Sequence, residues 1–162
     1  MRIAEYTVQE MKKRWTAWGG MYDLARVVDP LRLRLEITET ALARDAEQCG
    51  AAIAKLRKAG FIIEIDDFGN GHSSLSMLKD IQADLLKIDM GFLRETDNVS
   101  RSKIILGAII RLADSLGMDV VTEGVETQAQ LRFLFSQGCQ SFQGYYFSRP
   151  IPVEEFEGKY LA

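Results

Sequence analysis

Apolar residues along the chain follow two alternating periods. Short runs typical of β-strands alternate with longer stretches in which apolar residues recur every three or four positions, as in amphipathic helices. The strand-like runs are LRLRLEIT (31–38), FIIEID (61–66), ADLLKID (83–89), DVVTEG (119–124) and CQSFQGYYF (139–147). Strands that alternate with helices are joined by right-handed crossovers, so the pattern predicts an α/β fold with about five parallel strands.

The intervening helices have recognisable ends. Helical spacing is clearest from Leu42 to Leu56 and from Ile104 to Leu116, and a short helix is expected between Ser73 and Lys79. A further helix carries Leu131, Leu134 and Phe135, with Thr127 as its N-cap. Glycines follow three of these helices and are expected to end them, namely Gly60, Gly117 and Gly138.

The first 30 residues differ from the rest. Six apolar residues share one helical face that Gly19 and Gly20 interrupt, namely Val8, Met11, Trp15, Trp18, Tyr22 and Ala25. This pattern predicts an N-terminal amphipathic helical segment at 1–30, packed in the core rather than reserved for a partner. Because no linker is visible, we expect residues 1–162 to form a single domain.

Composition excludes several classes of protein. The net charge of -3 and the pI near 5.3 give no basic surface for a nucleic-acid polymer. No apolar run has the length of a membrane segment, and charged residues in the first ten positions argue against a signal peptide. We interpret Cys49 and Cys139 as buried thiols rather than a disulfide, which favours a cytoplasmic protein.

Polar residues gather where the strand-like runs end. They are Glu36 and Glu39, Asp66 and Asp67, Lys87 and Asp89, Glu123 and Glu126, and Gln143 within the fifth run. In parallel α/β folds the loops after the strands carry the chemistry, so these side chains are expected at one rim. Crowded carboxylates repel one another, and a divalent cation with hard oxygen ligands, Mg²⁺, Mn²⁺ or Ca²⁺, would relieve that repulsion.

The adjacent pair Asp66 and Asp67 raises a geometric question. Successive side chains of a strand point to opposite faces, so a regular strand would aim only one of them inward. We therefore expect the loop to begin at Asp67, with Gly69 and Gly71 supplying a permissive backbone. The pair could then bridge two metals about 3.5–4 Å apart, an arrangement used in phosphodiester cleavage.

Each of these residues also has a simpler interpretation. Acidic residues at strand ends often cap helices or lie in solvated turns, and a single lysine such as Lys87 is usually solvated. The only histidine, His72, is interpreted as a loop residue, and Gln143 by itself could be an ordinary ladder residue. The convergence of all five strand ends favours a common site, in which Lys87 would neutralise a phosphate oxygen or orient water.

Five of these segments resemble the EAL family of cyclic di-GMP phosphodiesterases. They are LEITET (35–40), IEIDDFGNGHSSL (63–75), LLKID (85–89), VVTEGVET (120–127) and GCQSFQGYYFSRPIP (138–152), in the order and spacing of that family. The resemblance implies that residues 31–155 form the C-terminal portion of a modified (β/α)8 barrel of the TIM type. It also implies Mg²⁺- or Mn²⁺-dependent hydrolysis of cyclic di-GMP to pGpG at a two-metal site.

The resemblance further implies a role for each residue of the rim. Glu36 and Asp66 resemble ligands of the first metal, and Asp66 and Asp67 ligands of the second. Lys87 and Glu123 resemble the residues that position or deprotonate the attacking water, with Gln143 holding it and Glu123 also close to the metals. Glu39 resembles the anchor of the loop 68–74, in which Asn70 and His72 replace the usual Thr and Tyr. The supporting residues are Gly69, Gly71, Asp89 and Glu126.

The sequence departs from the family upstream of residue 31. The Glu-Ala-Leu motif is absent, as are the arginine that follows it, the metal-binding asparagine of the next strand, and three of the eight strands. We expect an open barrel that the N-terminal helix, a second copy or another chain covers.

Three functions remain in view. The chain is a weak or inactive EAL-type hydrolase, or a non-catalytic module that binds cyclic di-GMP or a protein in signalling. A dimer that rebuilds the site is the third, although no residue here supplies the missing motif.

Overall fold

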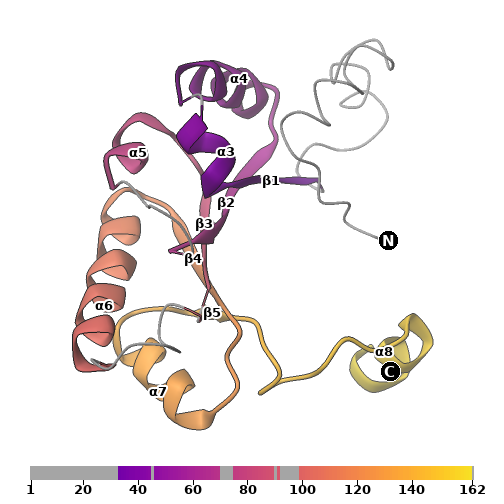
Figure 1. Cartoon of the computed structure of the whole chain (residues 1–162). Helices are drawn as coiled ribbons and strands as arrows, with labels where there is room; N and C mark the ends of the chain where they lie inside the picture. Colours follow the sequence, from indigo (N-terminus) through magenta and orange to yellow (C-terminus); the bar gives the residue numbers. More distant parts are fainter. Residues whose placement is uncertain (1–32, 45, 70–74, 90, 92–98, 162) are drawn as a thin grey trace.

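The computed structural model describes residues 33–44, 46–69, 75–89, 91 and 99–161 (Figure 1). The amphipathic helical segment predicted at 1–30 lies outside these residues, as do Gly71, Asn70 and His72. None of the helices in the described ranges is long and apolar enough to cross a membrane. Cys49 and Cys139 are both buried and form no disulfide, so the prediction of buried thiols is confirmed.

Five parallel strands form one sheet, in the order β1-β2-β3-β4-β5. Their bounds are β1 Arg34–Thr38, β2 Ile62–Phe68, β3 Leu85–Asp89, β4 Asp119–Glu123 and β5 Ser141–Phe142. Each strand pairs with the next in sequence, which is the expected result of short crossover helices. The predicted α/β fold with five parallel strands is therefore confirmed.

Helices connect the strands and cover the sheet. Their bounds are α3 Glu39–Arg44, α4 Ala46–Lys58, α5 Leu75–Asp80, α6 Val99–Ser115, α7 Gln128–Ser136 and α8 Val153–Tyr160. Figure 1 shows α4 to α7 along one side of the curved sheet, while α8 extends away from it. No residue of α8 is buried, and the sequence analysis did not predict this helix.

The helix ends agree with the sequence signals. Gly117 and Gly138 have positive φ angles of 74° and 96°, the left-handed conformation that commonly follows a helix. Thr127 caps α7 in a reciprocal arrangement, because its hydroxyl accepts from the Gln130 N–H while the Gln130 side chain accepts from the Thr127 N–H. The first helix begins at Glu39, directly after β1, rather than near Leu42 as the periodicity suggested.

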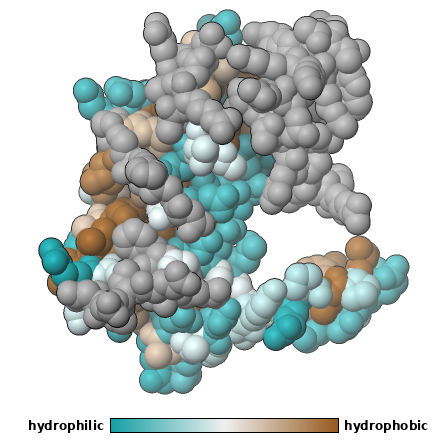
Figure 2. Space-filling model, in the orientation of Figure 1, coloured by the Kyte–Doolittle hydropathy of each residue, from teal (hydrophilic) through white to brown (hydrophobic). Residues whose placement is uncertain are grey.

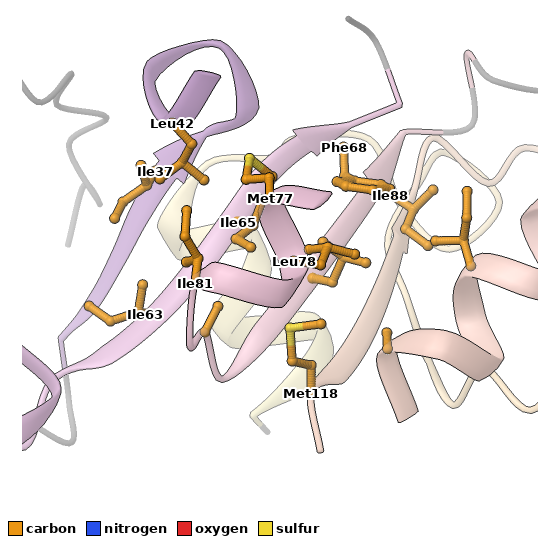
Figure 3. Close-up of a cluster of buried hydrophobic side chains, with 14 of the residues drawn as sticks. Ile37, Leu42, Ile63, Ile65, Phe68, Met77, Leu78, Ile81, Ile88 and Met118 are labelled. Carbon is orange, nitrogen blue, oxygen red and sulfur yellow. The ribbon is translucent and has the colours of Figure 1, made fainter. Parts of the chain in front are cut away.

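The hydrophobic core lies between the sheet and the helices. Strand residues that face the helices are apolar and almost fully buried, and Figure 3 shows Ile37, Ile63, Ile65 and Ile88 among them. They pack with helix residues such as Leu42, Met77 and Leu78. Burial of this surface removes apolar area from water and is the main force that holds the sheet to its helices.

The opposite face of the sheet carries the charged side chains of the strands, beside a few apolar ones such as Leu85. Because side chains alternate along a strand, the neighbours of the core residues point the other way, and they include Arg34, Glu36, Glu64, Asp66, Lys87 and Glu123. Figure 2 shows hydrophilic residues along the middle of the molecule, with apolar residues beside α6 and on α8. We call this polar side the inner face, and the candidate site lies on it.

The fifth strand is shorter than predicted. The expected run 139–147 contains only two strand residues, Ser141 and Phe142, after which the chain turns. A Cβ atom on Gly144 would lie 2.2 Å from the Val125 carbonyl oxygen, so only glycine allows this close approach. The turn is held by bonds from the Val125 N–H to the Gln143 oxygen (3.0 Å) and from the Tyr146 N–H to the Val125 oxygen (2.9 Å).

Candidate metal and catalytic site

The site is centred on the ammonium group of Lys87. Its nitrogen lies 2.8 Å from Glu36 Oε1, 2.9 Å from Asp66 Oδ1 and 3.0 Å from Glu123 Oε1. The three carboxylates come from β1, β2 and β4, and the lysine from β3. Four parallel strands thus deliver one charged side chain each to the same point, as predicted for the carboxyl ends of the strands.

The charges of this cluster do not cancel. Three carboxylates and one ammonium leave an excess of two negative charges. Burial alone would lower the pKa of Lys87, but its bonds to Glu36, Asp66 and Glu123 outweigh burial and raise that pKa above its ordinary value. The lysine is therefore a fixed positive charge at neutral pH.

Glu123 is shifted in the other direction from a typical paired carboxylate. Burial raises its pKa, and the charges of Asp66 and Glu36 raise it further, while the bond and charge of Lys87 only partly oppose them. A raised pKa makes the Glu123 carboxylate a stronger proton acceptor than an exposed glutamate.

One oxygen of the cluster is buried directly beside the shared ammonium. Asp66 Oδ1 is completely buried, and Lys87 Nζ lies 2.9 Å from it. A buried carboxylate needs a compensating positive charge, and here one ammonium serves three carboxylates. This excess of negative charge fits a hard divalent cation.

The carboxylates converge on the ammonium rather than on one another. Within the part of the chain that the structure describes, no three metal-ligating side chains are grouped closely enough to form a ready-made metal site. The donor set nevertheless consists of carboxylate oxygens, which favour Mg²⁺ or Mn²⁺ over Zn²⁺. The residues present therefore fit the charge and the ligand type of such an ion.

A β-bulge explains the adjacent aspartates and corrects one expectation. The strand does not end at Asp66: β2 continues to Phe68, and its register with β3 shifts between Ile65 and Phe68. Ile65 pairs with Leu86 and Phe68 with Ile88, so Asp66 and Asp67 together occupy the register position opposite Lys87. Asp67 has a φ of 56°, which is unusual for a residue other than glycine, and its side chain is exposed.

The bulge resolves the problem of alternation. Ile65 and Phe68 both pack in the helix-facing core, so the two residues between them replace one inner-face position. A bulge can therefore bring both carboxylates to the rim without a loop that starts at Asp67. Gly69 follows with a positive φ of 103°, consistent with the permissive backbone expected there.

Glu39 contacts the backbone at the end of β2. It is 4% exposed, and its Oε2 accepts a hydrogen bond of 3.0 Å from the Gly69 N–H. This contact joins the first turn of α3 to Gly69, the residue that directly follows β2. The predicted anchoring role of Glu39 is consistent with this bond and remains a prediction.

The other predicted residues lie around the cluster rather than within it. The Asp89 carboxylate accepts from the Gly91 N–H, and the Glu126 N–H donates to Gln130 in the cap of α7. Gln143 uses its backbone to bond Thr122 and Val125, and its side chain is exposed. Glu36, Asp66, Lys87 and Glu123 are thus the residues that the fold brings together.

The sequence analysis missed one ion pair on the inner face. Arg34 donates from Nη1 to Glu64 Oε1 over 2.8 Å, and Glu64 is only 5% exposed. The position of Glu64 could have been predicted from the alternation of side chains along β2. Glu64 lies two residues before Asp66 and therefore points to the same face of the sheet.

Comparison with known proteins identifies the family. Residues 22–150 match the model of the EAL domain. The chain belongs to the EAL domain family. Members of this family of cyclic di-GMP phosphodiesterases generally depend on divalent metals, and the chain is related to them.

Individual EAL proteins resemble the chain closely. The bifunctional diguanylate cyclase/cyclic di-GMP phosphodiesterase MucR of Pseudomonas aeruginosa is 43% identical over 145 residues, which cover 86% of this chain and 21% of MucR. The solved complex of the MucR phosphodiesterase with cyclic di-GMP has a TM-score of 0.73 at 43% identity, over 82% of this chain and 59% of that one. The manganese and cyclic di-GMP complex of Klebsiella pneumoniae BlrP1 has a TM-score of 0.70 at 38% identity, over 78% and 32%.

The chain spans only part of its relatives. It covers about a fifth of the length of MucR and little more than half of the solved MucR phosphodiesterase chain. The similarity therefore places the described strands in an EAL barrel but concerns one portion of that barrel.

Proposed function

We propose that the chain carries one portion of an EAL-type phosphodiesterase site and takes part in the metal-dependent hydrolysis of cyclic di-GMP to pGpG. The observation that carries this proposal is the convergence of Glu36, Asp66 and Glu123 on Lys87, which leaves more negative than positive charge in a partly buried cluster. The relatives named as cyclic di-GMP phosphodiesterases, and the solved MucR complex with cyclic di-GMP, support the choice of substrate.

Metal binding falls to the carboxylates of the rim. Glu36 and Asp66 would hold one Mg²⁺ or Mn²⁺ ion and Asp66 with Asp67 a second, with Glu123 close to both. The bulge supports this division, because it puts Asp66 and Asp67 at one register position of the strand, opposite Lys87. When bound, such ions lower the pKa of a water molecule and neutralise developing charge on the phosphate.

The remaining residues would orient the reaction. Lys87, whose pKa is raised by its three carboxylates, keeps its positive charge and would neutralise a phosphate oxygen or orient the water. Glu123, whose pKa is raised by burial, would accept the proton of the water. Gln143, which directly follows β5, would hold the same water.

The isolated chain is proposed to be a weak or inactive hydrolase. The sequence lacks the Glu-Ala-Leu motif, and the described sheet ends at β1 on one side and at β5 on the other. A metal site without part of its ligands binds and reacts poorly, since even outer-shell changes cost about 10–100-fold. The single domain 1–162 would thus comprise a helical segment at 1–30 and a portion of barrel at 31–155, in a cytoplasmic protein.

A second candidate function is a non-catalytic module that binds cyclic di-GMP or a protein in signalling. The edges of the sheet favour it, because β1 and β5 have no further strand beside them among the described residues, and unpaired strand edges invite another strand or chain. A second copy of the chain, or another chain, would then cover the open side. Light scattering after size-exclusion chromatography would test this, and a monodisperse monomer would exclude association.

Turnover of cyclic di-GMP by the purified chain in Mn²⁺ tests the first proposal, beside Asp66→Asn as its control. Formation of pGpG that disappears in the control would mean that the described rim is sufficient for chemistry. Without turnover, calorimetric titration with cyclic di-GMP separates a binding module from a chain that does not bind the nucleotide. A rise in melting temperature with Mn²⁺ would report metal binding by the folded state independently of turnover.

A further inference from the structure

Two glutamates are neighbours on the inner face: Glu36, which belongs to the cluster around Lys87, and Glu64, which pairs with Arg34. Glu36 of β1 is the register partner of Glu64 of β2, so the two residues are direct neighbours on adjacent strands. Like charges in this position destabilise a sheet unless each has its own cation. Lys87 bonds Glu36 at 2.8 Å, and Arg34 bonds Glu64 at 2.8 Å.

A fourth carboxylate, that of Glu64, lies diagonally across from Lys87 on the neighbouring strand. Glu64 is in register with Leu85, two residues before Lys87 on the same face of β3. Arg34 reaches Glu64 across the same diagonal, because Arg34 is in register with Ile62. Long side chains bridge such diagonal positions readily, so an uncompensated Glu64 would compete with Glu36 for the lysine.

We propose that Arg34 is a positioning residue of the site: by neutralising Glu64, it leaves Lys87 to Glu36, Asp66 and Glu123. The Glu64 carboxylate is 6% exposed and cannot rely on water, whereas the Arg34 side chain is 54% exposed and reaches in from the edge strand. The inference rests on the proposed function only for what Lys87 does there. The pairing itself can be tested in the metal-free protein.

The lysine ammonium provides a direct readout. Among the described lysines, Lys87 alone is shielded from solvent, while Lys55, Lys58, Lys79, Lys103 and Lys159 are exposed. Ammonium protons held by three carboxylates exchange slowly with water, so the ¹⁵N–¹H spectrum should contain a protected signal from Lys87. Lys87→Gln would assign that signal by removing it.

A double-mutant cycle at Arg34 and Glu64 tests the proposal in the full 162-residue chain. Arg34→Met should shift or remove the Lys87 signal, because Glu64 then attracts the ammonium. Glu64→Gln should leave the signal in place, and the double variant Arg34→Met/Glu64→Gln should restore it. Arg34→Lys, which keeps the charge, should match the wild type.

Three outcomes would overturn the proposal: no protected signal in the wild type, an unchanged signal in Arg34→Met, or no restoration in the double variant. If the Arg34–Glu64 pair served only packing, substitution of either residue would disturb the site. A loss of the Lys87 signal in Glu64→Gln as large as that in Arg34→Met would therefore also contradict the proposal. If Arg34→Met does not fold, the double variant decides, because it carries no uncompensated charge. It must fold and retain the signal.

Mn²⁺ affinity gives a second readout and separates this inference from the proposed function. Arg34→Met leaves a negative charge beside the site and should bind Mn²⁺ about three- to tenfold more tightly, whereas Glu64→Gln leaves a positive charge and should bind it more weakly by a similar factor. The double variant should return to the wild-type value. Changes of the same sign in both single variants would overturn the inference while leaving the proposed function intact. A wild-type chain that binds no Mn²⁺ would instead overturn the proposed function, and the lysine signal would still decide the role of Arg34.

Discussion

The two faces of the sheet are built from alternate residues of the same strands, yet they differ in almost every physical property. The helix-facing side carries Ile63, Ile65, Leu86 and Ile88, each at most 1% exposed. The inner face carries Glu64, Asp66 and Lys87 between those same residues. The helix-facing side stabilises the fold by burying apolar area away from water. The inner face instead brings together like charges that repel one another and favour the binding of a cation.

This contrast explains how the fold tolerates a site with an excess of negative charge. The free energy gained by the apolar face is distributed over many contacts, so it does not depend on any charged residue. The excess of two negative charges around Lys87 is therefore carried by a sheet that its helices hold in place. We therefore expect substitutions on the helix-facing side to lower the free energy of unfolding, and substitutions on the inner face to change mainly the affinity for Mn²⁺.

The largest effect is expected for Asp66→Asn on the inner face. It removes a charge from the proposed ligand shared by both metals and should weaken Mn²⁺ binding by about 100-fold or more, since even outer-shell changes cost up to that factor. The metal-free protein should lose only about 1 kcal/mol, because the ion pair of Asp66 with Lys87 is lost while Glu36 and Glu123 keep theirs. Calorimetric Mn²⁺ titration and urea unfolding check the two halves, and a large loss of metal-free stability would contradict the contrast.

The opposite result is expected for Leu86→Ala on the helix-facing side. Leu86 is completely buried, so truncation should lower the free energy of unfolding by about 2–5 kcal/mol through lost burial and a cavity. Mn²⁺ affinity of the remaining folded protein should not change. Ile104→Ala is a matched control, because Ile104 is 69% exposed on α6 and its truncation should cost less than about 0.5 kcal/mol.

Lys87→Met should give an intermediate effect that depends on metal. Without the ammonium, Glu36, Asp66 and Glu123 lose their shared partner, and the metal-free protein should lose about 1–3 kcal/mol. A divalent cation should then replace the missing charge. We expect Mn²⁺ to raise the melting temperature of this variant more than that of the wild type, and an equal rise in both would argue against a shared site.

The smallest effect is a pH dependence at Glu123. Burial, together with the charges of Asp66 and Glu36, raises the pKa of Glu123 above 4.5, so the folded state binds its proton more tightly than the unfolded state. Glu123 should therefore reduce stability as the pH rises from about 4.5 through its folded pKa. In urea unfolding without metal, Glu123→Gln should gain stability relative to the wild type over that interval, and a constant difference between the two proteins would refute the shift.

Much of the site follows from alternation along single strands. The period-two pattern of LRLRLEIT and ADLLKID places Glu36 and Lys87 on the face opposite the apolar residues, and crossover helices force the strands to be parallel. Both properties are local, so they could be predicted without a structure. The helix stops at Gly117 and Gly138 are local in the same sense, because they depend on one residue with positive φ.

Other features depend on contacts between distant segments, and only the tertiary structure decided them. The bulge at Asp66 and Asp67 is a mismatch between β2 and β3, and β5 is short because Gly144 approaches the backbone of Val125. Whether Lys87 or Arg34 pairs with a given glutamate depends on the register between neighbouring strands. The sequence of a single strand does not specify that register. The sequence by itself determined which residues face the site, whereas pairing across strands determined which of them touch.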